Sequence, residues 1–218
     1  MTGPAEAVIA ELRAMADPGR REGQARVGIQ VDRALGVSIP DLRRLARRLG
    51  RDHALALALW DSGVHEARIL AGMVDDPSLV TPGQMERWVL DFDSWDVCDQ
   101  VTELFERTSY AWSLAFQWAG RDEEFVRRAA FALIARMAVH RKLTPDDEFV
   151  AFFPLIRAAA GDDRNYVKKA VNWALRQLGK RSPFLREAAI TCAERIQADG
   201  TRSGRWIAAD ALRELRAR

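Results

Sequence analysis

The chain is organised around the stretch Phe92-Asp93-Ser94-Trp95-Asp96-Val97-Cys98-Asp99-Gln100-Val101. Ser94 is a favourable N-cap residue, and Asp96 stands in the first turn, where a carboxylate suits the positive end of the helix dipole. The stretch therefore predicts the start of an amphipathic helix. Trp95 and Asp99 are four residues apart, so this helix places an indole and a carboxylate one above the other on the same face. A flat apolar wall beside an acid is a candidate site, although the same spacing also occurs where the tryptophan packs in a core and the aspartate is solvated.

Helical patterns surround this stretch on both sides. Apolar residues recur at helical spacing, and Gly, Pro, Asp and Ser punctuate the runs, whereas no segment shows the alternation of a strand. The predicted helices are residues 4–17, 20–28, one opening at 38, 52–60, 64–74, one opening at 81, one starting at 94, 109–119, 122–140, 144–160, 165–179, 183–199 and 201–216. The sequence therefore predicts an all-α fold.

Antiparallel helix pairs with short connections are typical of stacked units of roughly 40 residues, as in HEAT arrays. We predict one such HEAT-like repeat domain over residues 1–218. A solenoid of this kind has a concave surface formed by one helix from each pair, and elongated partners lie along it. Trp95, Asp99, Arg128 and Trp173 fall on three predicted helices about one repeat apart, as expected for residues that line a groove.

The charges are unevenly distributed along the chain. The formal net charge is only +2, but residues 51–125 hold 5 basic and 15 acidic side chains, whereas residues 126–218 hold 19 basic and 10 acidic ones. A concentration of positive charge is the footprint expected for a polyanionic partner. Solvated helix faces in an arginine-rich chain would give the same count, so charge alone leaves both interpretations open.

The remaining composition excludes several classes of protein. The chain is 48% hydrophobic and 29% charged, which is typical of a globular protein, and no apolar run is long enough to cross a bilayer. The two cysteines have no metal-like spacing, so we expect a reducing compartment, the cytoplasm, and no disulfide. The three histidines are scattered and form no ligand motif. We predict neither a metal site nor a nucleophile turn, and Cys98 is expected to pack rather than to react.

Three further stretches carry a resemblance to a known family. They are Leu35-Gly36-Val37-Ser38-Ile39-Pro40-Asp41-Leu42-Arg43-Arg44-Leu45, Arg127-Arg128-Ala129-Ala130, and Tyr166-Val167-Lys168-Lys169-Ala170-Val171-Asn172-Trp173-Ala174-Leu175-Arg176. Together with the Trp95-Asp96-x-x-Asp99 pattern, and in the same order, they make most of the chain resemble the DNA alkylation repair family of AlkD-like HEAT-repeat DNA glycosylases. The resemblance implies a curved array of antiparallel helix pairs that acts as a monomer on double-stranded DNA with alkylated bases, near the nucleoid and without a cofactor.

The resemblance also implies a reaction and the residues that perform it. The reaction is hydrolysis of the N-glycosidic bond of purines alkylated at N3 or N7. Departure of the base leaves an oxocarbenium-like sugar, which a carboxylate stabilises. Asp99 would take that role, and Trp95 and Trp173 would flank the sugar. Arg128 would hold a backbone phosphate, and the further candidates for contacts to the DNA strand are Lys168, Lys169, Arg176, Arg43 and Arg44, of which the last two could equally lie on a solvated face.

The choice of lesion follows from the acids available. A cationic alkylpurine leaves without being protonated, whereas a neutral purine needs a general acid. The only nearby second acid, Asp96, lies about 100° around the helix from Trp95. The enzyme is therefore expected to accept cationic lesions and to spare neutral ones, and the resemblance implies that the base is not flipped into a protein pocket.

One position departs from the family pattern. Val27 stands where the glycosylase that typifies the family has a tyrosine, so a contact from that side is expected to be missing. This keeps two alternatives open, a non-catalytic HEAT-repeat DNA-binding protein and a protein-binding scaffold. Trp206, which follows Arg202 and Arg205, either faces a partner or packs, whereas most of the other tryptophans are expected in the core.

Overall fold

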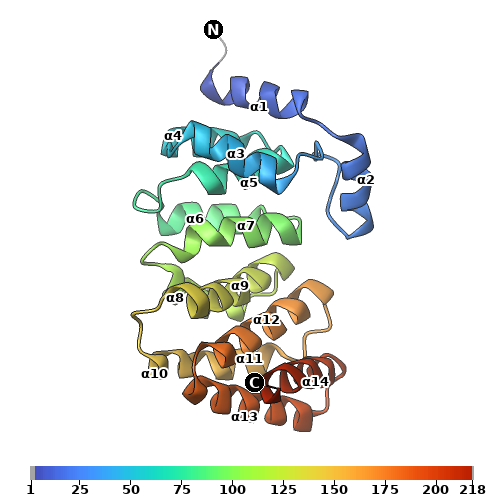
Figure 1. Ribbon diagram of the computed structural model, residues 1–218, viewed down its shortest axis with the longest axis vertical. Helices are drawn as coiled ribbons and strands as arrows, with labels where there is room; N and C mark the ends of the chain where they lie inside the picture. Colours follow the sequence, from blue (N-terminus) through green and yellow to red (C-terminus); the bar gives the residue numbers. More distant parts are fainter. Residues whose placement is uncertain (1–2, 218) are drawn as a thin grey trace. The chain divides into compact units, whose positions relative to one another are not determined.

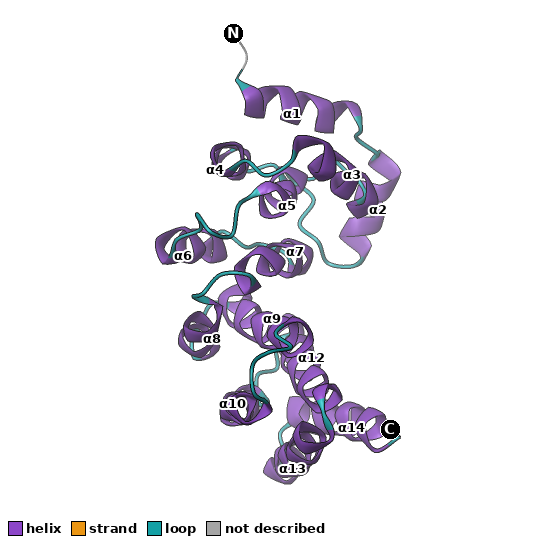
Figure 2. Cartoon of the chain, turned by 60° about the vertical axis from the view of Figure 1, so that its left-hand side comes forward, coloured by secondary structure: helices purple, strands orange, loops and turns teal. Residues whose placement is uncertain are grey.

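The computed structural model describes residues 3–217, and every regular element within that range is a helix (Figure 1). Figure 2 shows only helices and loops over the same residues. The predicted all-α fold is therefore confirmed. The chain divides into two compact units, one ending at Thr108 and the other beginning at Ser109, and each is described by itself.

The first unit consists of short helices packed in two layers. Figure 2 shows α4 and α6 in one layer and α3, α5 and α7 in the other, and α5 packs against α3, α4 and α7. The helices are α1 (Pro4–Ala14), α2 (Pro18–Arg26), α3 (Ile39–Leu49), α4 (His53–Asp61), α5 (His65–Val74), α6 (Pro82–Leu90) and α7 (Trp95–Glu106). All seven begin where the sequence predicted, within about two residues.

The second unit is built around the packed pair of long helices α9 and α12. The helix α12 packs against α9, α13 and α14. The elements are α8 (Ala111–Ala119), α9 (Glu124–His140), α10 (Asp146–Phe149), the 3-10 turn η1 (Val150–Phe152), α11 (Phe153–Ala159), α12 (Asn165–Arg181), α13 (Pro183–Asp199) and α14 (Arg202–Arg216). The prediction of one continuous helix over residues 144–160 was wrong. Pro154 has no N–H and its ring would clash with the Val150 carbonyl, so the run breaks and α11 starts afresh.

Local sequence chemistry explains most helix ends. Side chains of N-cap residues accept a backbone N–H at the start of six helices, as expected for Ser, Thr and Asp. Proline occupies the first turn of several of them, where its missing N–H costs nothing. Gly200 ends α13 in the left-handed conformation, with φ of 73°.

Repeat spacing differs between the units. In the first unit, three side-chain hydrogen bonds between successive layers each join residues 31 positions apart. In the second unit, three equivalent bonds join residues 38 positions apart. The predicted period of roughly 40 residues therefore describes the second unit, and the first is built from shorter repeats.

Tryptophans form much of the core, as predicted. Trp60 and Trp88 are stacked with ring centroids 4.1 Å apart, and they are 1% and 0% exposed. Trp118 is also fully buried, and Trp112 packs on Phe152 with centroids 4.5 Å apart. Each such ring removes on the order of 200 Å² from water, so the tryptophans stabilise both units strongly.

Candidate functional site

The helix α7 begins at Trp95, as the sequence predicted, but its N-cap works differently from expectation. The Ser94 hydroxyl donates to Asp96 Oδ1 at 2.8 Å and accepts no backbone N–H. The same Asp96 oxygen accepts the Val97 N–H at 2.9 Å. The carboxylate of Asp96 therefore caps the helix from within its own first turn, and Ser94 orients that carboxylate.

Asp96 is also the anchor that fixes α7 to α5. His65 Nε2 lies 2.8 Å from Asp96 Oδ2, and the side chains are 3% and 12% exposed. Burial opposes the charged imidazole, but the hydrogen bond and the charge of Asp96 outweigh it and raise the pKa of His65 above 6.5. Burial likewise disfavours the carboxylate, yet the His65 contact prevails and lowers the pKa of Asp96. This buried ion pair leaves Asp96 unsuited to act as a second acid.

The indole of Trp95 is half-buried and held at its polar edge. Its Nε1 donates to the main-chain carbonyl of Val27 at 3.1 Å, across 68 positions of sequence. The expectation that residue 27 leaves a contact missing was therefore incomplete. The Val27 side chain is 57% exposed, but its backbone still reaches the tryptophan. The contact fixes the orientation of the indole plane.

Asp99 lies one turn beyond Trp95 on the same helix and is half-buried. The helical spacing on which its assignment depends is confirmed, because α7 is continuous from Trp95 to Glu106. Its main-chain carbonyl accepts the Thr102 hydroxyl at 3.1 Å. Its role in catalysis stays a prediction.

The loop that precedes α3 is tied to α5 by one buried carboxylate. Glu66 is 0% exposed and accepts the backbone N–H groups of Leu35, Gly36 and Val37 at 2.8, 2.7 and 3.3 Å. Gly36 has φ of +82°, and a Cβ built there would lie 2.2 Å from the Asp17 carbonyl oxygen. Leu35, Gly36 and Val37, at the start of the first family-like stretch, are therefore held against α5 by Glu66.

A shallow groove of about 220 Å³ crosses α3, α5 and α7. It contains three arginines together with the carboxylate of Glu103, and its lining is Arg43, Ala46, Arg47, Gly72, Met73, Gln100, Glu103, Leu104 and Arg107. Of the two predicted phosphate ligands on α3, Arg43 is exposed and lines this groove. Arg44 is exposed as well but forms an ion pair with Asp41.

Arg128, on α9 of the second unit, is almost completely buried. It is 6% exposed, and its Nη1 donates to the Tyr166 carbonyl at 2.7 Å. This bond joins α9 to the start of α12. Its neighbour Arg127 lies 2.8 Å from Asp162 Oδ2. Burial disfavours the Asp162 carboxylate, but its bonds to Arg164 and Arg127 prevail and lower its pKa to about 2.

Trp173 is half-buried on α12. The Arg136 guanidinium, from α9, lies 6.0 Å from the ring centroid. With the Gln177 amide turned so that its oxygen faces the indole, Trp173 Nε1 donates to it at 3.2 Å. The ring is thus supported by a cation and an amide, in the second unit, while Trp95 and Asp99 belong to the first.

The other predicted strand-binding residues of α12 divide into two groups. Lys168 lies against the Trp206 ring with Nζ 5.0 Å from the centroid, and Lys169 is exposed. Arg176 instead reaches α14, where it pairs with Asp210 at 3.2 Å and with Glu214. Its guanidinium therefore ties two helices together, and its contribution to DNA binding stays a prediction.

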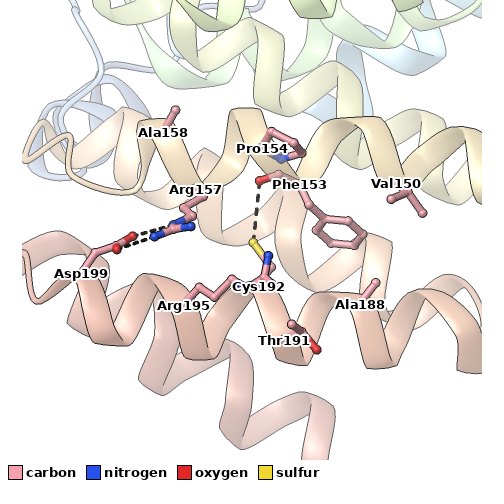
Figure 3. Close-up of a pocket in the computed structure, with 10 residues that line it drawn as sticks. All are labelled: Val150, Phe153, Pro154, Arg157, Ala158, Ala188, Thr191, Cys192, Arg195 and Asp199. Carbon is pink, nitrogen blue, oxygen red and sulfur yellow. Dashed lines mark hydrogen bonds and ion pairs between the residues drawn. The ribbon is translucent and has the colours of Figure 1, made fainter.

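A cavity of about 670 Å³ lies elsewhere, between α11 and α13 (Figure 3). At one end Arg157 pairs with Asp199 through contacts of 2.7 and 2.8 Å. At its centre Cys192 Sγ lies 3.7 Å from the Phe153 carbonyl oxygen. Burial raises the pKa of the Cys192 thiol to about 11, so this sulfur is no nucleophile at neutral pH. None of the predicted site residues lines this cavity.

Metal clusters and membrane spans are both absent from the described residues. Within residues 3–217, no three His, Cys, Asp or Glu side chains are grouped so that they could hold a metal ion. Over the same range, none of the helices has the length and apolarity needed to cross a membrane. Among the described residues, Cys98 and Cys192 are both buried and form no disulfide, and Cys98 packs as predicted.

Sequence reasoning missed the tertiary partners that position the candidate residues. His65 and Glu66 are adjacent on α5, yet one anchors α7 and the other clamps the loop before α3. Each partner lies about 30 positions away, so no local spacing could have revealed it. The available signal was a His-Glu pair at the start of a largely apolar helix, which indicates buried polar groups in need of partners.

A solved structure described as a new family of proteins related to the HEAT-like repeat DNA glycosylases, with affinity for branched DNA structures, aligns with a TM-score of 0.79. The two are 18% identical, and the alignment covers 87% of this chain and 81% of that one, so the likeness establishes the HEAT-like fold. No curated protein sequence matches the chain significantly. The family model described as DNA alkylation repair enzyme matches residues 8–215, and the chain therefore belongs to the DNA alkylation repair enzyme family.

Proposed function

We propose that the protein is a monofunctional DNA glycosylase that releases N3- and N7-alkylated purines from double-stranded DNA. The observation that carries this proposal is the face of α7 on which Asp99 stands one turn beyond Trp95, in a chain of the DNA alkylation repair enzyme family. The start of that helix is fixed by His65 and Asp96, and the indole is held by the Val27 carbonyl. Such preorganisation is what electrostatic catalysis needs.

The way in which the N-glycosidic bond breaks defines the roles of Asp99 and Trp95. When the N-glycosidic bond breaks, its electron pair goes to the cationic base, which leaves as a neutral purine. Positive charge develops on the sugar, where the Asp99 carboxylate stabilises it and the electron-rich face of Trp95 favours it. A water oxygen then bonds to the anomeric carbon, and the water proton passes to solvent. The reaction needs no cofactor.

The choice of lesion follows from the engagement of Asp96. Because Asp96 is paired with His65 in the core, no second carboxyl group of α7's first turn is available to protonate a neutral base. A purine that already carries an alkyl group at N3 or N7 leaves without that proton. The base also has no need to enter a protein pocket, which favours tolerance of bulky adducts.

The positive charge of the second unit supports double-stranded DNA as the partner. In the second unit, Lys168, Lys169 and Arg202 form no ion pair within the described residues. Cations without acidic partners gain most from contact with phosphates, because binding releases condensed counterions. Arg128 is proposed to contribute one phosphate contact in addition to its bond with Tyr166.

The deciding experiment is a base-release assay. DNA treated with a methylating agent is incubated with the protein, and free 7-methylguanine and 3-methyladenine are quantified. The wild type should release both, and Asp99→Asn should release them far more slowly. Absence of release by a folded wild-type protein that binds the DNA would refute the glycosylase assignment.

A second candidate is a non-catalytic DNA-binding protein. Two observations favour it: Val27 occupies a position at which the typifying glycosylase has a tyrosine, and the structural relative is described by its affinity for branched DNA. This candidate predicts salt-sensitive binding to DNA with no base release. Failure to bind any DNA would favour the third alternative, a protein-binding scaffold.

A further inference from the structure

Trp206 is an exposed indole, whereas the other six tryptophans are buried or half-buried. It is 43% exposed, whereas Trp60, Trp88 and Trp118 are at most 1% exposed. It lies in the second turn of α14, next to α12. Trp206 takes no part in the proposed glycosylase chemistry. A single exposed aromatic side chain is common on protein surfaces and does not by itself indicate a partner, so the charges around this ring are decisive.

Cations surround this indole on both helices. Lys168 Nζ lies 5.0 Å from the ring centroid, and Arg202 is one helical turn before Trp206 on α14. Lys169 follows on α12 and is exposed. Arg205 donates to the Gly200 carbonyl and so keeps its positive charge at the same end of α14. Within residues 3–217, Lys168, Lys169 and Arg202 are paired with no carboxylate.

The charges of the same two helices are balanced at their other ends. Arg176 pairs with Asp210 and Glu214, and Lys180 lies 3.2 Å from Glu214. Asn172 Nδ2 donates to Asp210 at 2.7 Å. The acids of α14 are thus used to join it to α12, and this includes Asp210, one helical turn beyond Trp206, which is held by Arg176 and Asn172.

The acids near the Trp206 end are already engaged. Asp163 accepts the Ser203 hydroxyl, and Asp162 is held by Arg164 and Arg127. The surface made by Lys168, Lys169, Arg202 and Trp206, here termed the α12–α14 platform, is therefore a flat aromatic ring within a cluster of positive charges.

We propose that the α12–α14 platform binds a single unpaired nucleotide, with the base stacked on Trp206 and the adjoining phosphates on Lys168, Lys169 and Arg202. Every nucleobase has a flat face that stacks on an aromatic side chain, and the phosphates complement the cations. In a continuous duplex those faces are covered by neighbouring base pairs. The platform therefore selects DNA that exposes a base, such as a gap or an end. This inference rests on the proposed binding of DNA, but not on the proposed glycosylase activity.

The test compares two DNAs that differ only in one feature. Fluorescence anisotropy measures binding to a continuous duplex and to the same duplex with a short single-stranded gap. The wild type should bind the gapped DNA about tenfold more tightly. Trp206→Ala should abolish that preference while leaving duplex affinity within about twofold, and Trp206→Phe should keep most of the preference, because phenylalanine also stacks.

A matched control and a direct readout make the outcome decisive. Phe184 is an exposed aromatic of the same unit, 56% exposed, so Phe184→Ala should leave the preference unchanged. A 2-aminopurine placed in the gap should be quenched on binding to the wild type and not to Trp206→Ala. Equal affinity of the wild type for both DNAs, or quenching that survives Trp206→Ala, would overturn the platform.

Different experimental results would refute the α12–α14 platform and the glycosylase proposal. Base release from a methylated duplex is measured with the same protein preparations. Release without a gap preference would refute the platform alone. A gap preference without release would refute the glycosylase alone, and thermal unfolding of each variant confirms that it is folded.

Discussion

His65 Nε2 lies 2.8 Å from Asp96 Oδ2, and this buried contact fixes the start of α7 against α5. The candidate residues Trp95 and Asp99 flank Asp96 on that helix. The direction in which they project therefore depends on an ion pair that takes no part in the proposed reaction.

This ion pair predicts a pH-dependent stability. The pKa of His65 is raised above 6.5 in the folded state, so its contribution is fully present below pH 6.5 and is lost as the pH rises through the raised value. The lowered pKa of Asp96 keeps the carboxylate charged down to below pH 3.8. The wild type should therefore lose more unfolding free energy than His65→Gln between about pH 6 and about pH 9. Urea titrations at both pH values measure the difference.

The matched control for this prediction is His140→Gln, which changes an exposed histidine. It should keep the pH dependence of the wild type. If His65→Gln shows the same dependence as the wild type, then the two buried groups do not form an ion pair in solution.

Asp99→Asn should slow base excision by about 2–4 kcal/mol of barrier, which is the usual contribution of one preorganised electrostatic group. The amide keeps the shape of the side chain but cannot stabilise a sugar cation. DNA affinity should stay nearly intact. Single-turnover release of 7-methylguanine measures the rate, and Asp93→Asn, a change at an exposed acid before the same helix, should leave it unchanged. An unaltered rate in Asp99→Asn would remove this residue from the mechanism.

Arg128→Ala should affect both DNA binding and stability. Loss of one phosphate contact should reduce the slope of log affinity against log salt by about one. Because Arg128 is 6% exposed and donates to the Tyr166 carbonyl, its loss should also destabilise the protein by about 1–3 kcal/mol. Lys169→Ala is the matched control: this exposed cation should lower the salt slope without changing the melting temperature. A salt slope that Arg128→Ala leaves untouched would make Arg128 purely structural.

Gly36→Ala should destabilise the first unit by more than Gly50→Ala. Both glycines have positive φ, +82° and +73°, so both substitutions cost about 1 kcal/mol from backbone strain. Only at Gly36 would the new Cβ meet backbone, 2.2 Å from the Asp17 carbonyl oxygen, whereas nothing lies within 4 Å at Gly50. Chemical denaturation of the two variants checks this order, and equal losses would mean that the loop can move away from Asp17.

The lesion selectivity should follow the charge of the base. We expect release of 7-methylguanine and of a bulky N7 adduct from otherwise identical duplexes, and no release of hypoxanthine. The physical reason is that a cationic purine leaves without protonation, while the nearest second acid, Asp96, is held by His65. Efficient excision of hypoxanthine would contradict this mechanism, and rejection of every bulky cationic adduct would contradict the open approach to the sugar.

Local sequence determined the helices and the spacing of the first candidate residues. Ser38 and Thr81 marked helix starts because their side chains accept nearby backbone N–H groups, an interaction complete within three residues. Trp95 and Asp99 could be placed on one face of α7 for the same reason, since helical geometry fixes residues four apart. The buried tryptophans followed from apolar periodicity, and only the break at Pro154 interrupted a predicted helix.

Tertiary structure decided which polar groups serve the site and which hold the fold together. Arg43 and Arg44 are adjacent and alike in sequence, yet one lines a groove and the other pairs with Asp41. Lys168 and Arg176 belong to one family-like stretch, yet one lies on an exposed indole and the other joins α12 to α14. Arg44 pairs within its own helix, whereas the partners of His65 and Arg176 lie 31 and 38 positions away on other helices. Their pairing depends on how the layers pack, because burial makes an unsatisfied charge far more costly than any local preference can offset.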